Sequence, residues 1–186
     1  MSAALRDLFT EALQAVDADG IDETRTYLVN LCCHCATPEI FRSERPETGT
    51  PALTWLYAEA RARPSVETWR RMGDVALAVG GLFAPHVERP RALVGRRYYE
   101  SMGSAAYATA AGHARHDAFG QLLQSLARYF RASMDALNQV ARQLGLPGVD
   151  ATELLVQRLV DDPASVDGHR ALGAQGLGLV WSSGQA

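Results

Sequence analysis

The chain has 186 residues, a formal net charge of −3 and 47% hydrophobic residues, an ordinary composition for one globular domain. All 18 basic residues are arginine, and the sequence contains no lysine. This excludes a lysine-bearing phosphate-binding P-loop, Schiff-base and pyridoxal phosphate chemistry, and the protein-kinase pattern. No apolar run approaches the ~20 residues needed to cross a bilayer, so we expect no membrane-spanning segment.

Apolar residues at helical spacing predict two helices in the N-terminal part of the chain. The first carries its apolar stripe over residues 5–16 and stops at Gly20. The second is capped by Asp22 and ends before Pro38. Residues 37–50 combine proline, glycine and charge, which is typical of a loop.

The middle of the chain predicts a helix over residues 50–60 and another over residues 65–83. From Val75 onward the second of these is apolar on nearly every face. A helix that is apolar all round is buried, so we place it at the centre of the fold. Residues 85–90, bracketed by two prolines, should form an irregular connection.

The C-terminal half predicts a helix over residues 96–113 and a long one over residues 117–144. Gly145 and the proline that follows should end the long helix. Shorter helices are expected after Asp150 and Asp162.

The fold class is therefore all-α, with no strand pattern of period two. We expect one helical bundle of about six to eight helices over residues 1–172, followed by a loosely ordered tail over residues 173–186. Two long antiparallel helices, 65–83 and 117–144, should form its core.

Charge is unevenly distributed along the chain. Residues 1–60 have a net charge of −6, and residues 61–97 have a net charge of +5. We expect the basic stretch to pair with the acidic N-terminal third, within one chain or across a dimer, although an anionic ligand is an alternative. The overall acidic balance argues against nucleic-acid binding. The arginines concerned are Arg61, Arg63, Arg70, Arg71, Arg89, Arg91, Arg96 and Arg97.

Three cysteines fall within four residues, Cys32 to Cys35. They cannot form a disulfide framework, and no secretory signal precedes them, so we expect a reducing, cytoplasmic setting. Cys32 and Cys35 share a helix face with Leu28 and Leu31, which favours core packing. The alternatives are a metal site or a reactive thiol.

A metal site would need two further ligands. His113 and His116 have i, i+3 spacing and would complete a set of two cysteines and two histidines with Cys32 and Cys35. For the reactive thiol, Cys33 is the candidate, because it points away from the apolar face and His34 is adjacent.

Asp74 is the most informative residue, because it interrupts the most apolar helix of the chain. A buried carboxylate needs a partner, and Arg96, Arg97, Tyr98 and Tyr99 are the expected candidates. One interpretation is a structural ion pair or hydrogen-bonded tyrosine that fixes helix register. The other is a polar pocket for a small ligand. Its lining would be Asp74, Tyr98, Tyr99, Met102 and Tyr107.

Two segments carry a resemblance. Residues 72–77, MGDVAL, are followed by residues 98–107, YYESMGSAAY, and together they resemble a family of uncharacterised bacterial all-helical proteins with GDVAL and YYxxMGxxAY motifs. The resemblance spans about residues 25–172 and carries no activity. It implies a helical cytoplasmic domain in which Asp74, Tyr98, Tyr99 and Tyr107 belong to one local arrangement.

Catalytic signatures such as H-E-x-x-H, G-x-S-x-G and a complete G-x-G-x-x-G do not occur in the sequence. The sequence therefore favours a non-catalytic helical module, a homodimer, that binds a partner protein or a small ligand. The alternative is a cysteine and histidine site that carries metal, haem or thiol chemistry, with or without enzymatic activity. No cofactor is identified by the sequence.

Overall fold

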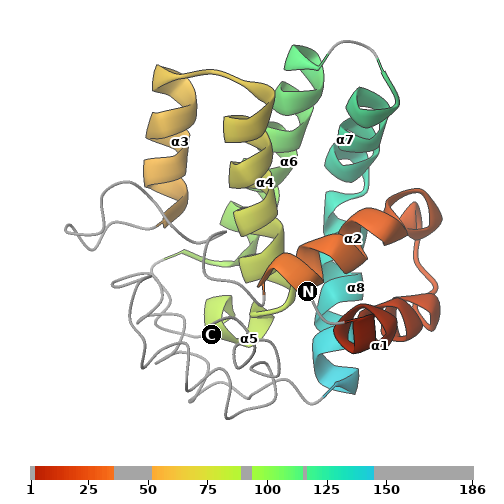
Figure 1. The fold of residues 1–186 in the computed structure, drawn as a ribbon. Helices are drawn as coiled ribbons and strands as arrows, with labels where there is room; N and C mark the ends of the chain where they lie inside the picture. Colours follow the sequence, from red (N-terminus) through yellow and green to blue (C-terminus); the bar gives the residue numbers. More distant parts are fainter. Residues whose placement is uncertain (1–2, 36–51, 89–93, 115–116, 145–186) are drawn as a thin grey trace, which may run out of the picture.

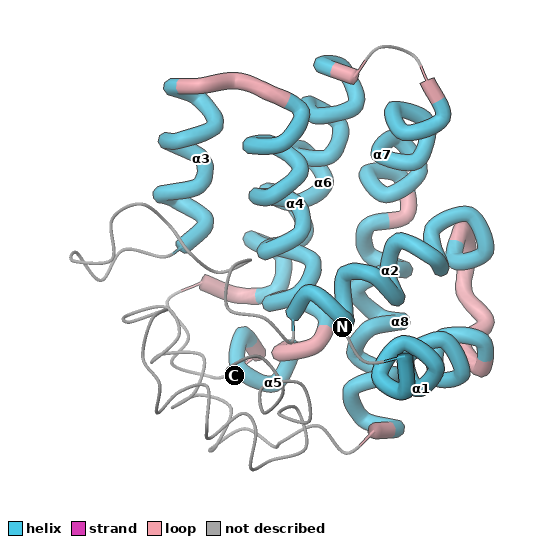
Figure 2. Tube along the Cα trace, viewed as in Figure 1, coloured by secondary structure: helices cyan, strands magenta, loops and turns pink. Residues whose placement is uncertain are grey.

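The computed structural model describes residues 3–35, 52–88, 94–114 and 117–144 (Figure 1). Within these ranges every regular element is a helix, which confirms the predicted all-α class (Figure 2). Seven helices have 11 to 18 residues, and α5 has four. None of the helices described here is long and apolar enough to cross a membrane. The elements are α1 (Ala3–Gln14), α2 (Ile21–Cys35), α3 (Ala52–Ala62), α4 (Val66–Gly81), α5 (Ala84–Val87), α6 (Arg96–His113), α7 (Ala118–Arg128) and α8 (Phe130–Gln143).

Helix α4 lies at the centre of the described fold, as its composition predicts. Every residue from Met72 to Gly81 is buried, and α4 packs against α3, α6 and α8 (Figure 1). Its start is fixed by Ser65, whose side chain accepts a hydrogen bond from the Thr68 backbone amide at 3.1 Å. The Thr68 hydroxyl in turn accepts one from the Ser65 amide, which completes a capping box.

Helices α4 and α6 form the most extensive pair, because small residues let them approach closely. A Cβ on Gly103 would lie 2.7 Å from the Ala76 side chain and 2.2 Å from the ring of Phe130. A Cβ on Gly80 would lie 2.3 Å from Met134. Glycine at these positions therefore allows α4, α6 and α8 to meet without an intervening side chain.

Helix α3 rests on α4 at the side of the fold. Its buried face consists of Leu53, Leu56 and Ala60. Among the described helices, α4 is the one with which α3 shares extensive contacts. The edge of the Tyr57 ring packs against Trp69, with the ring centroids 5.9 Å apart.

The predicted long helix over residues 117–144 is wrong in one respect, because Tyr129 divides it into α7 and α8. Tyr129 has φ −101° and ψ 24°, outside the helical range. The apolar stripe continues across the break, so periodicity does not reveal it. The ring of Tyr129 packs on Gly20 and the ring of Phe130 packs on Gly103, so two consecutive aromatic side chains are held by different parts of the fold.

Helices α1 and α2 form a hairpin that packs across α8 (Figure 1). The first helix is predicted to stop at Gly20, but α1 already ends at Gln14. Gly20 lies in the turn before α2 and has φ +72°, a left-handed conformation that glycine adopts without strain. Helix α2 then begins at Ile21, one residue before the predicted cap Asp22, which instead pairs with Arg25 at 2.7 Å.

The remaining sequence predictions concern the connection after α4 and residues that the structure does not describe. Residues 85–90 are predicted to form an irregular connection, but their first residues belong to the one-turn helix α5, Ala84–Val87. The predicted loop over 37–50, the helices expected after residue 150 and the tail over 173–186 lie outside the described residues. The predicted domain boundary at residue 172 lies outside them as well.

We expect Gly20→Ala to lower the free energy of unfolding by about 2 kcal/mol or more. The new Cβ would lie 2.2 Å from the ring of Tyr129, and a left-handed alanine is itself strained. Urea unfolding of the purified variant measures the loss. The matched control is Gly112→Ala in α6, where nothing lies within 4 Å and greater helix propensity should add up to about 1 kcal/mol. Equal stability of Gly20→Ala and wild type would contradict the packing described.

Candidate functional site

The candidate site is built around Asp74, which α4 holds inside the bundle. Its neighbours on α4 are all apolar or glycine from Met72 to Gly81, and Asp74 is 4% exposed. Burying an ionised carboxylate without hydrogen-bonding or ionic partners costs far more free energy than one helix–helix contact contributes. The stability of this region therefore depends on the groups that contact Asp74.

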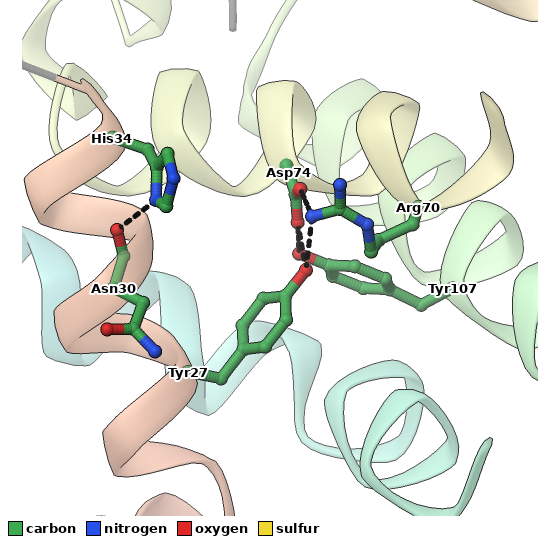
Figure 3. Close-up of polar contacts among 6 residues, drawn as sticks. All are labelled: Tyr27, Asn30, His34, Arg70, Asp74 and Tyr107. Atoms are coloured by element: carbon green, nitrogen blue, oxygen red, sulfur yellow. Dashed lines mark hydrogen bonds and ion pairs between the residues drawn. The ribbon is translucent and has the colours of Figure 1, made fainter. Parts of the chain in front are cut away.

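Three side chains from three helices donate hydrogen bonds to the Asp74 carboxylate (Figure 3). The Tyr27 hydroxyl on α2 and the Tyr107 hydroxyl on α6 both reach Oδ1, at 2.5 and 2.7 Å. Arg70, one turn earlier on α4, reaches Oδ2 through Nη1 at 2.8 Å. The same Nη1 lies 3.5 Å from the Tyr27 oxygen. We call these four residues the Asp74 cluster.

The position of Tyr107 depends on close packing. A Cβ on Gly73 would lie 2.7 Å from the Tyr107 ring, so glycine at this position admits the ring against α4. Phe130 packs on the same ring with centroids 5.8 Å apart, and the edge of Tyr27 approaches it at 6.2 Å. Tyr107 is fully buried, and Asp74 is the acceptor of its hydroxyl.

The two charged members of the cluster respond differently to burial. Loss of hydration raises the pKa of Asp74, and Arg70, Tyr27 and Tyr107 only partly offset this. Burial alone would lower the pKa of Arg70, but Asp74, Tyr27 and Tyr107 together outweigh this effect and raise that pKa. Arg70 keeps contact with solvent, with 38% of its side chain exposed, so it retains hydration that Asp74 has lost.

Both tyrosines of the cluster stay protonated at neutral pH. Burial raises the pKa of Tyr27 and of Tyr107, and the negative charge of Asp74 raises both further. Their hydroxyls therefore serve as hydrogen-bond donors to the carboxylate.

His34 lies beside the cluster on the last turn of α2 (Figure 3). Its Nδ1 is 2.7 Å from the backbone carbonyl oxygen of Asn30. Its electrostatic effect lowers the pKa of Asp74. Helix α2 thus brings two side chains to the cluster, Tyr27 and, two turns later on the same face, His34.

The predicted partners of Asp74 are wrong. Arg96 instead pairs with Asp135 at 2.5 Å and with Glu88 at 3.9 Å. Tyr98 and Tyr99 pack edge-on against each other, with centroids 5.5 Å apart. Burial raises the pKa of Tyr99 to about 12. Arg97 is exposed.

Helix register explains this difference. Antiparallel α4 and α6 place Gly73 against Tyr107 and Gly80 against Tyr99. Tyr99 therefore lies beside Gly80, which is six residues, or ~9 Å, along α4 from Asp74. Of the five predicted pocket residues, the structure brings together Asp74 and Tyr107, whereas Tyr98, Tyr99 and the partly buried Met102 lie nearer the start of α6.

Sequence reasoning missed Arg70 and Tyr27. Arg70 precedes Asp74 by four residues, and this i, i+4 spacing is a recognisable signal for an ion pair on one helix face. Tyr27 lies 47 residues away and is brought in by the packing of α2, for which the sequence contains no local signal.

The cysteines lie at the end of α2 and are free thiols. Cys32 and Cys33 are buried and Cys35 is partly exposed, so the prediction of Cys33 as the exposed thiol is wrong. Burial raises the pKa of all three thiols, which disfavours a nucleophilic thiolate at neutral pH.

The predicted metal ligands are only partly covered by the structure. His113 is exposed at the end of α6, and His116 lies outside the described residues. Within the described part of the chain, no three His, Cys, Asp or Glu side chains are grouped to hold a metal ion.

Among the described arginines of the basic stretch, most ion pairs are formed with acids outside the N-terminal third, and Arg89 and Arg91 lie outside the described residues. Besides the Arg70 and Arg96 pairs, Arg71 meets Glu59 at 3.5 Å, the one such contact that reaches back before residue 61 among the described side chains. Arg61, Arg63 and Arg97 are exposed and form no ion pair with another described residue.

Comparison of the chain with protein-family models, with curated proteins and with solved structures gives no match. The resemblance of residues 72–77 and 98–107 to a bacterial family therefore stays a prediction.

We expect Asp74→Ala to destabilise the protein by about 3–5 kcal/mol, because it leaves the buried Tyr107 hydroxyl and the guanidinium of Arg70 without their acceptor. Asp74→Asn keeps an acceptor for the tyrosines and should cost less. Asp135→Asn, which breaks the exposed pair with Arg96, is the control and should cost ~0–1 kcal/mol. Urea unfolding of the three variants at neutral pH provides the comparison.

The pH dependence of Asp74→Asn tests the electrostatics. Because burial raises the pKa of Asp74, the folded state binds its proton more tightly than the unfolded state. Wild-type stability should then fall as pH rises from the unfolded pKa of Asp74 through its folded pKa, and the Asn variant should escape this loss. A stability difference between the two proteins that moves the opposite way over this window would contradict a raised pKa.

Proposed function

We propose that this chain is a non-catalytic helical binding module, and that its ligand is a small molecule with a carboxylate or phosphate group held by Arg70. The observation that carries the proposal is the position of Arg70, which is anchored to Asp74 on one side and open to solvent on the other. The proposal develops the second of the two interpretations of Asp74 from the sequence, a polar pocket for a small ligand.

Arg70 has further hydrogen-bond donors besides the one that contacts Asp74. A guanidinium has five N–H groups, and the contacts to Asp74 and Tyr27 use Nη1. The remaining donors suit a planar carboxylate or a phosphate, which an arginine binds bidentately. Because Asp74 raises the pKa of Arg70, the guanidinium stays charged, and its anchored geometry reduces the entropy lost on binding.

The chemistry of the cluster favours binding over catalysis. The Asp74 carboxylate already accepts three hydrogen bonds, and both tyrosines are held protonated. Neither group is therefore available as a general base at neutral pH. The raised pKa of the thiols likewise favours a binding module over the alternative of cysteine-based catalysis.

We expect phosphate or succinate to raise the melting temperature of the wild-type protein and to leave that of Arg70→Ala unchanged, because the variant lacks the anion contact. Arg63→Ala is the matched control, since Arg63 is exposed and unpaired among the described residues, and it should respond like wild type. Thermal unfolding at constant ionic strength, with chloride as the reference anion, makes the measurement. An equal shift in all three proteins would show general salt stabilisation and would contradict the proposal.

We also propose that the module is a homodimer, with the exposed face of α7 at the interface. The apolar stripe over residues 117–144 lies mostly inside the chain, where Leu123, Leu126 and Phe130 are buried. Phe119 is 40% exposed, and Leu122, one turn later, is partly buried. These two residues are the part of the apolar stripe that is not covered within the chain, and we place them in contact with the second copy.

Light scattering of wild type should give about twice the 20.1 kDa chain mass, and Phe119→Arg should shift it toward the monomer, because a charge would then face an apolar partner surface. Leu8→Arg, at an exposed apolar residue on α1, is the control and should leave the mass unchanged. A wild-type mass near one chain at high concentration would contradict the dimer.

A further inference from the structure

The last turn of α2 gathers three thiols of different accessibility. Cys32 and Cys33 are buried, and Cys35, the final residue of the helix, is partly exposed. The thiols are close enough to affect one another electrostatically, since Cys32 and Cys33 both contribute to the raised pKa of Cys35. Neither the Asp74 cluster nor the proposed binding of an anion uses them.

Helix geometry selects one pair among the three. Residues i and i+3 share a helix face, and their Cα atoms are ~5 Å apart in an α-helix. This falls within the 4.4–6.8 Å range of disulfide-bonded cysteines. Cys33 and Cys35, at i and i+2, point to opposite sides of the helix, and the adjacent Cys32 and Cys33 diverge by about 100°. Cys32 and Cys35 are therefore the pair that can meet.

The position of the pair at the helix end makes the bond attainable. The last four carbonyls of a helix have no intrahelical partner, so this turn can change its winding at lower cost than an interior turn. The last turn must change its winding for the disulfide to form, because the β-carbons of i and i+3 residues lie farther apart in an ideal helix than in a disulfide.

We propose that Cys32 and Cys35 form a redox modification site that is oxidised to an intramolecular disulfide by a low-molecular-weight disulfide such as oxidised glutathione. Cys35, the one residue of the three that is not fully buried, loses its thiol proton and attacks one sulfur of the oxidant, which releases a first thiolate. Cys32 then loses its proton and attacks Cys35 Sγ, which releases the second thiolate. The protein loses two electrons and two protons, and the oxidant becomes two thiols.

The order of attack follows from accessibility. Cys35 can meet the oxidant because it is partly exposed, whereas Cys32 is shielded until the mixed disulfide has formed next to it. Burial raises the pKa of both thiols, so the reaction is slow at neutral pH and the pair stays reduced under brief oxidation. This site is independent of the proposed ligand contact at Arg70, and either proposal can fail without the other.

The test uses Cys33→Ala, which leaves the proposed pair as the only two cysteines of the chain. The folded variant is incubated with oxidised glutathione at mildly alkaline pH until its mass is constant, then denatured and treated with N-ethylmaleimide. We expect an intact mass lower by two hydrogens, with no maleimide and no glutathione attached. Dithiothreitol should restore two reactive thiols.

Single-cysteine variants provide the matched controls. In Cys32→Ala/Cys33→Ala the mixed glutathione disulfide at Cys35 should persist, because no resolving thiol remains. In Cys33→Ala/Cys35→Ala glutathione should not be incorporated into the folded protein. Wild type is oxidised in parallel, and there one maleimide should map to Cys33.

Three results would overturn the proposal. They are two maleimide-reactive thiols in oxidised Cys33→Ala, a glutathione adduct that persists in that variant, and a disulfide that includes Cys33 in wild type. If Cys33→Ala does not fold, as judged by circular dichroism, the peptide map of oxidised wild type decides alone.

Discussion

Burial of a single carboxylate in the centre of the bundle sets conditions that its own helix and two others must meet. Asp74 occupies the helix with the least contact to water, and its charge is tolerated because Tyr27, Tyr107 and Arg70 replace the hydration it has lost. The donors come from α2, α6 and α4 itself, so the positions of these helices relative to one another are fixed by one acceptor. An apolar residue at this position would pack without specifying register; the carboxylate makes register a requirement.

The glycines of α4 and α6 belong to the same requirement. Hydrogen bonds to a buried carboxylate must be short, and the Tyr107 hydroxyl can reach Asp74 only because its ring lies directly against the backbone at Gly73. Phe130 also packs on this ring and lies against Gly103. Close packing and the hydrogen bonds of Asp74 therefore depend on each other. A larger residue at Gly73 would displace the Tyr107 ring and so also remove a hydrogen-bond donor from the carboxylate.

The sequence was sufficient for much of the fold and for less of the site. Helical periodicity predicts the class, the burial of α4 and the starts of α4 and α7 at Ser65 and Asp117, because these features are local. It also identifies Asp74 as the unusual residue. It fails for the partners of Asp74, which depend on the antiparallel register of α4 and α6, and for Tyr27, which depends on the packing of α2.

The same limit applies to the break at Tyr129 and to the burial of Cys33. In both places the local residue spacing predicts something else, an unbroken helix at Tyr129 and an exposed side chain at Cys33. Residues that are distant in the sequence determine the observed structure. Tyr129 leaves the helical conformation where its ring packs on Gly20, more than one hundred residues away in the chain. Cys33 is covered although it lies off the apolar face of α2.

Helix α3 contributes no donor to Asp74 and shares its extensive contacts with α4 alone among the described helices. Its attachment consists of a few apolar side chains, one aromatic pair and the Arg71–Glu59 contact. Regions attached in this way open at a lower free energy than the core to which they are attached. The amides of α3 should therefore exchange with solvent through local unfolding, while those of α4 and α6 exchange only when the whole bundle opens.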